Sequence, residues 1–107
     1  MSLDVYLIAN RPSEIFSGNI THNLGEMAVA AGIYEALWRP DELGITTAHQ
    51  LIKPLRYGLA RLRGDPEKFK AHNPENGWGS YDGLMRLVVE YLAACEESPD
   101  ATVKVSR

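Results

Sequence analysis

The chain has 107 residues, and its 45% hydrophobic content is enough for one domain with one core. Acidic and basic residues are interspersed and sum to a formal net charge of -3, which argues against the clustered basic surface that nucleic acid requires. The single cysteine, Cys95, has no partner for an intramolecular disulfide, and no apolar run reaches the length of a membrane span. We therefore expect a single soluble, cytoplasmic domain over residues 1–107.

Three segments alternate in hydrophobicity with the period of a β-strand. They are residues 3–9, residues 14–18 and residues 101–106, with a turn at 10–13 between the first two. Two strands alone are marginal in water, so we expect all three to pair in one small antiparallel sheet.

The chain between the second and third strands has the period of a helix. Helices are predicted over residues 24–38, from Thr47 to a stop at Gly64, and from near Ser80 to just before Pro99, with a short helical turn after Asp65. Capping-box spacing at the start of the second helix and an N-cap followed by proline at the short turn support these boundaries. The predicted fold is α+β, in the order β-β-α-α-α-β.

Two features are expected to disturb these helices. Pro54 lies inside the second helix, where its ring clashes with the preceding turn, so it should kink or split that helix. Gly25 and Gly32 lie on nearly one line of the first helix and weaken it, which predicts another backbone crossing there.

The first candidate site lies where the second strand meets the first helix. Four polar side chains stand within five positions there: Asn19, Thr21, His22 and Asn23. A helix start has free N–H groups and a partial positive charge, so it can hold a phosphate or carboxylate. The alternative is simple capping by Thr21 or Asn19, with the other side chains in water. A cap needs only one such residue.

The second candidate is the loop at 73–81, which contains Asn76, Trp78 and Tyr81. Aromatic faces beside a helix start can stack on nucleobases or sugars, although packing of Trp78 on the protein body is the more common outcome. Arg39 is a weaker third candidate at the end of the first helix. Its planar guanidinium suits a phosphate, whereas a surface ion pair with Asp41 or Glu42 is the ordinary alternative.

Catalysis has less support from the sequence. His22 is the best acid–base candidate and Glu14, on the neighbouring strand, could orient it or share its work, but no further partner orients the pair. The three histidines show no ligand spacing and no cysteine pair is present, so no metal site and no cofactor are expected. His49 and His72 are expected on the surface.

Three motifs carry a family resemblance over nearly the whole chain. They are Asn-Ile-Thr-His-Asn-Leu-Gly at 19–25, Gly-Ile-Tyr-Glu-Ala-Leu-Trp-Arg-Pro at 32–40 and Asn-Gly-Trp-Gly-Ser-Tyr at 76–81. With these motifs the chain resembles a group of short, uncharacterised proteins encoded in phage and bacterial genomes. The resemblance implies kinship and a phage setting, in which small domains can counter host defence, but it supplies no catalytic residue.

The sequence favours a non-enzymatic binder of a small anionic, nucleotide-like molecule, acting in the (host) cytoplasm, with sequestration as a phage counter-defence role. The alternative is a protein-interaction module that inhibits a host protein through Trp38, Trp78 and Tyr81. A small hydrolase or transferase using His22 is the third hypothesis. Exposed sheet edges also predict a homodimer, and neither nucleic acid nor a membrane is expected as a partner.

Overall fold

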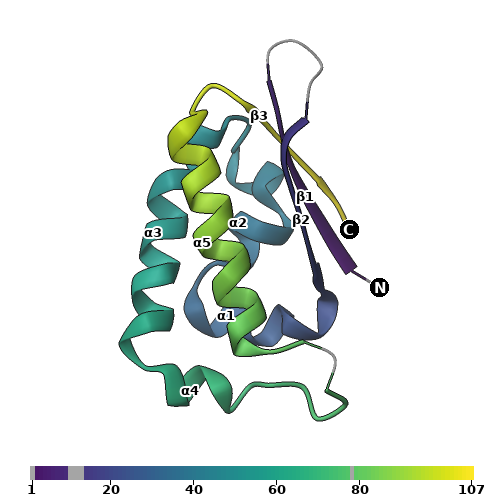
Figure 1. Cartoon of the computed structure of the whole chain (residues 1–107), viewed down its shortest axis with the longest axis vertical. Coiled ribbons are helices and arrows are strands. Elements are labelled where there is room, and N and C mark those ends of the chain that lie inside the picture. Colours follow the sequence, from purple (N-terminus) through teal and green to yellow (C-terminus); the bar gives the residue numbers. More distant parts are fainter. Residues whose placement is uncertain (1, 10–13, 78) are drawn as a thin grey trace.

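The computed structural model describes residues 2–9, 14–77 and 79–107, so the turn expected at 10–13 lies outside the described residues. The order of elements confirms the predicted α+β fold (Figure 1). The strands are β1 (Ser2–Ile8), β2 (Glu14–Thr21) and β3 (Thr102–Ser106), and the α-helices are α1 (Gly25–Ala31), α2 (Tyr34–Trp38), α3 (Ala48–Gly64), α4 (Pro66–Lys70) and α5 (Tyr81–Glu97). Short 3-10 helices cover His22–Leu24 and Pro40–Leu43.

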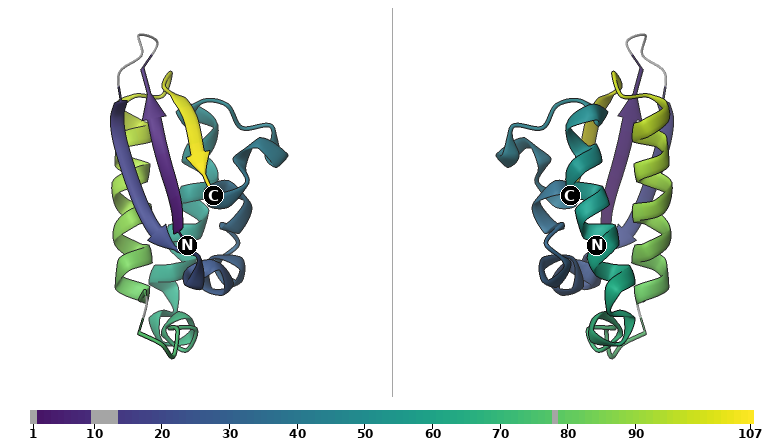
Figure 2. Two further views of the ribbon diagram at one scale, coloured as in Figure 1. Left: turned by 90° about the vertical axis from the view of Figure 1, so that its right-hand side faces the viewer. Right: turned by 90° about the vertical axis from the view of Figure 1, so that its left-hand side faces the viewer.

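The three strands form one antiparallel sheet in the order β2-β1-β3. On β1, Leu3, Val5 and Leu7 are fully buried, whereas the residues between them are half-buried, as the alternation predicted. In the described part of the chain, the helices lie behind one face of this sheet and leave the other face uncovered (Figure 2). β2 extends to Thr21, three residues beyond the predicted strand end, and this moves the first candidate site onto the sheet.

The single helix predicted over 24–38 is wrong. Gly32 adopts a left-handed conformation with φ 77°, and it ends α1 as a C-cap; α2 begins two residues later. Gly25 and Gly32 are therefore helix boundaries, and the atoms nearest to them across the fold belong to the side chains of Tyr34 and Tyr57. A left-handed position favours glycine because it has no Cβ to clash with the backbone.

The start signals predicted for α3 and α4 are confirmed. The Gln50 side-chain oxygen accepts from the Thr47 amide at 3.0 Å, which completes the predicted capping box of α3. α3 is not split at Pro54 but continues to Gly64. Asp65 caps α4, as predicted, and α5 begins next to Ser80, whose side chain caps it.

The buried apolar side chains form one cluster between the sheet and the helices. α5 contributes a row of buried side chains to this cluster: Leu84, Leu87, Val88, Tyr91, Leu92 and Cys95. Among the residues that the structure describes, none of the helices has both the length and the apolar composition needed to cross a membrane.

A tight contact that the sequence analysis did not single out falls at Gly58 of α3, which packs against Ile33, the residue just before α2. A Cβ added to Gly58 would lie 1.8 Å from Ile33 Cγ2. We expect Gly58→Ala to destabilise the fold by about 2–3 kcal/mol in urea unfolding, since overpacking forces the neighbours to move. The cost should be smaller in an Ile33→Ala background, which removes the clashing methyl.

Gly64→Ala is the matched control for this substitution, because a Cβ at Gly64 meets nothing within 4 Å. It should be neutral or stabilise by up to about 1 kcal/mol through the unfolded chain. Equal effects of the two substitutions would contradict the tight contact at Gly58.

Cys95 is a fully buried thiol in the core, as predicted. Burial, and then the nearby Glu96 carboxylate, raise the pKa of the Cys95 thiol to about 12. Since only the thiolate reacts with disulfide reagents, we expect no reaction with Ellman's reagent in the folded protein at about pH 8 and a full reaction in denaturant. Rapid labelling of the folded chain would show that Cys95 is accessible.

Candidate functional site

The end of β2 and the first half of α5 border a groove of about 350 Å³, called here the β2–α5 groove. It joins the two segments that the sequence analysis selected, because both the 19–21 strand end and the 79–80 loop end line it. The lining residues are Asn19, Ile20, Thr21, Leu24, Gly79, Ser80, Gly83, Arg86, Leu87 and Glu90.

Close packing at two glycines brings these segments together. A Cβ at Gly18 would lie 2.5 Å from Leu87 Cδ1, so the Leu87 side chain of α5 packs directly over the β2 backbone at this glycine. Gly79 has φ 104°, and a Cβ there would lie 2.7 Å from Thr21 Cγ2. The loop therefore passes the end of β2 at a distance that only glycine permits.

The start of α5 offers fewer free donors than an open helix end. The Tyr81 amide donates to Asn73 Oδ1 at 2.8 Å, and the Gly83 amide donates to Ser80 Oγ at 3.1 Å. The helix dipole remains, but an anion in the groove would depend mainly on side-chain charge.

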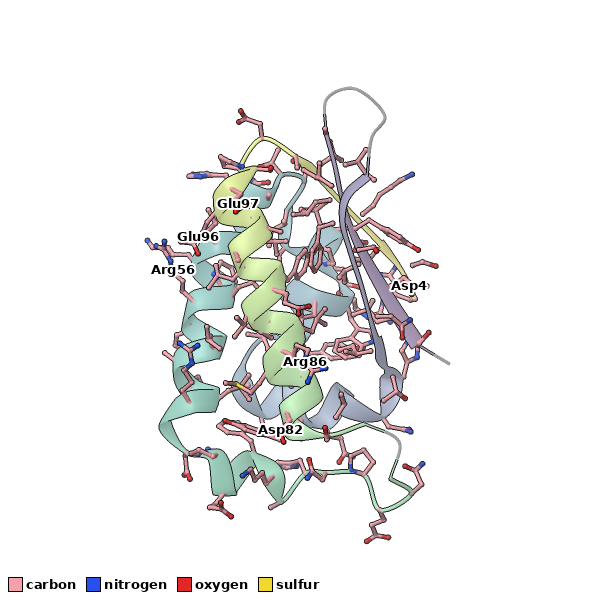
Figure 3. The ribbon with its side chains drawn as sticks, viewed as in Figure 1. Asp4, Arg56, Asp82, Arg86, Glu96 and Glu97 are labelled. Atoms are coloured by element: carbon pink, nitrogen blue, oxygen red, sulfur yellow. The ribbon has the colours of Figure 1, made fainter. Side chains whose placement is uncertain are left out.

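Arg86 supplies that charge. It lies on α5, level with the lower end of β2 (Figure 3). Within residues 2–9, 14–77 and 79–107, it forms no ion pair, even with Asp82 and Glu90, its neighbours one turn away on the helix. A guanidinium with five N–H donors in this position can bind a phosphate or carboxylate.

Sequence reasoning missed Arg86 and Glu90 as site residues. Gly83, Arg86, Leu87 and Glu90 recur every three or four residues and thus share one side of α5 with part of its apolar row. Arg86 and Glu90 are two polar residues at the edge of the apolar row of α5, and this pattern could have indicated that this side of the helix borders a site. Its relation to β2 depends on tertiary packing.

The polar cluster at 19–23 stands at the start of a short 3-10 helix (His22–Leu24) and not of an α-helix, which corrects the expectation for this segment. Asn19 and Thr21 belong to β2, and the helix that follows, α1, has only seven residues. Asn19 Nδ2 donates to Ser2 Oγ at 3.0 Å and to Asp4 Oδ1 at 2.6 Å, which ties its side chain to β1. Thr21 Oγ1 accepts from the Asn23 amide at 3.3 Å, so its capping role is confirmed.

His22 and Asn23 line a second pocket of about 540 Å³ with Glu26 and the 71–75 loop. The structure thus separates them from Asn19 and Thr21. The His22 ring stands edge-on to Trp38 with 6.1 Å between ring centroids, and its Nε2 atom is buried with no hydrogen-bond partner among the described residues. His49 and His72 are exposed, as predicted, and His72 borders this second pocket.

The loop aromatics do not form the expected platform in the described part of the loop. Tyr81 is 6% exposed and its hydroxyl donates to the Leu62 carbonyl at 2.6 Å, so it is a core residue. Burial, and then Asp82, raise the pKa of the Tyr81 phenol. Trp78 lies outside the described residues, and Asn76 is exposed but does not line the groove.

Arg39 lies at the end of α2 and does not line the groove either. It pairs with Glu42 at 3.1 Å, which is the ordinary alternative considered for it. Hydrogen bonding to Tyr34, and then to Glu42, raises the pKa of the Arg39 guanidinium. It therefore adds no charge to the β2–α5 groove.

The proposed catalytic pair of His22 and Glu14 is incompatible with the strand. Glu14 pairs with Ile8 at one end of β2, and Thr21, next to His22, ends the strand at the other. At roughly 3.3 Å per residue, these ends are about 23 Å apart. The described residues also contain no group of three or more His, Cys, Asp or Glu that could hold a metal ion.

Comparison with known proteins gives no assignment, since no family model, curated protein or solved structure matches the chain.

The buried hydroxyl of Tyr81 gives a test of its role. We expect Tyr81→Phe to lower the free energy of unfolding by about 1 kcal/mol, because the Leu62 carbonyl loses its donor, while leaving any ligand bound in the groove. Tyr57→Phe is the control: Tyr57 is 57% exposed, so it should change stability little. A Tyr81→Phe protein as stable as the parent but unable to bind ligand would instead indicate direct contact.

Proposed function

We propose that this protein binds a small anionic ligand in the β2–α5 groove, with nucleoside phosphates as the favoured class, and that it does so without catalysing a reaction. The proposal rests on the position of Arg86. It lines a groove of about 350 Å³ and has no anionic partner within the described chain. An unpaired cation beside a cavity is the usual way in which proteins attract phosphates and carboxylates.

The rest of the lining suits such a ligand. Ile20, Leu24 and Leu87 give one side an apolar surface, on which a base or sugar can pack. Thr21 and Ser80 add hydroxyl groups beside it. Small-molecule sites commonly combine an apolar wall with a few polar groups that fix orientation, and the volume lies near the lower end of their range.

Binding is favoured over catalysis because, among the described residues, the groove holds no base that is oriented toward a nucleophile. His22 lines the other pocket, and the His22–Glu14 pair is excluded by the length of β2. Within the groove, Glu90 is the ionisable group that could accept a proton, and no hydrogen bond among the described residues orients it toward a nucleophile. General acid–base catalysis requires such an oriented pair.

The resemblance to short phage and bacterial proteins supports a biological role for simple binding. A small domain that captures a nucleotide signal removes it from host defence without further chemistry. The alternative of a host-protein inhibitor loses two of its three anchors, since Trp38 and Tyr81 are 3% and 6% exposed. Homodimer formation stays a prediction from the two sheet edges.

The test is mass spectrometry of small molecules that heat releases from protein purified out of cells. We expect the parent to release an anionic compound and Arg86→Gln to release much less, because a charge-assisted contact worth roughly 1.5–3 kcal/mol is lost. Retention of the compound by Arg86→Gln, or a parent that carries no anion and binds no nucleotide in titrations, would contradict the proposal.

Two variants control for this experiment. Arg56→Gln makes the same change of charge at an exposed residue on α3, paired with Glu96 and outside the groove (Figure 3). His22→Ala removes a side chain that lines the second pocket and does not line the groove. Both should release the compound as the parent does.

A further inference from the structure

Three polar side chains line the β2–α5 groove one after another along α5. The Ser80 hydroxyl stands at its start, Arg86 near its middle and Glu90 at its far end. Ten residues of helix at about 1.5 Å per residue make this row about 15 Å long. That length suits an extended molecule, such as a nucleoside phosphate, better than a lone anion.

The two charged side chains of the row are both available to a ligand. Glu90 is exposed and, like Arg86, takes part in none of the ion pairs formed by the described residues. Ser80 and Arg86 both lie on the N-terminal side of Glu90 in this row. Donors thus gather at one end, and a carboxylate stands at the other.

A carboxylate constrains the ligand more than the arginine does. It only accepts hydrogen bonds, and it repels a second anionic group. A ligand with its phosphate near Arg86 and Ser80 must therefore present donors at the end that reaches Glu90. Two adjacent N–H groups are the best match, because the two oxygens of a carboxylate can accept both at once.

Among nucleobases, guanine offers this pair of donors, its ring N1–H and its 2-amino group. Hypoxanthine keeps the ring N–H but lacks the amino group, and adenine has an acceptor at N1. We infer that the ligand is a guanine nucleoside phosphate, with its phosphate held by Arg86 and its base read by Glu90. The inference rests on the proposed function and names the ligand class of the same groove.

The experiment is a calorimetric titration of ligand-free protein with guanosine, inosine and adenosine monophosphates. We expect the parent to bind the guanine nucleotide at least about tenfold more tightly than the other two, which is the usual scale of a bidentate contact with a base. Glu90→Gln should reduce guanine binding to the level of adenine and leave adenine binding unchanged or stronger.

Glu97→Gln is the matched control, since Glu97 is also an exposed α5 carboxylate but does not line the groove. It should keep the guanine preference. Equal binding of all three nucleotides by the parent, or a preference that survives Glu90→Gln, would overturn the guanine assignment. In either case Arg86→Gln separately reports on anion binding, so the proposed function would stand if that variant still lost the nucleotides.

Discussion

The contact between β2 and α5 fixes the geometry on which the candidate site depends. Gly18 lies so close to Leu87 that a Cβ would be 2.5 Å from the leucine methyl, and one turn further along α5 the Tyr91 ring stacks on Phe16 with centroids 5.3 Å apart. Together these contacts set both the distance and the direction of the helix on the strand. They therefore determine which side chains of α5 stand beside the strand end.

The groove follows from this packing together with the loop before α5. Because Gly79 passes close to Thr21, the helix must begin beside the end of β2, and Ser80 caps it there. A helix of seventeen residues then carries Arg86 and Glu90 at fixed spacing along the groove. A rigid helix holds charged groups more precisely than a loop does. This precision favours a site that recognises a ligand by the fixed positions of one positive and one negative side chain.

Local sequence signals predicted the fold well and the site only in part. The caps at Thr47 and Asp65 act through neighbouring residues, so their spacing was sufficient to place two helix starts, and the hydrophobic period placed the start of α5 near Ser80. The expected helix over 24–38 failed because Gly32 lies in a left-handed conformation, and periodicity alone does not reveal a backbone angle. Residues 19–21, from the first candidate segment, and residues 79–80, from the second, line one groove. Arg86 was missed since its role arises from a contact between distant segments.

The larger second pocket is a weaker site for an anion despite its histidines. Glu26 and Glu75 line it, and their carboxylates repel a phosphate. The Nε2 atom of His22 is buried beside the Trp38 ring, away from the solvent that a proton-transfer group would need to reach. Trp38 itself is fixed by stacking on Tyr34, with ring centroids 5.1 Å apart. His22 is thus best explained as part of an aromatic cluster that anchors α2, whereas the β2–α5 groove keeps an unpaired cation at its edge.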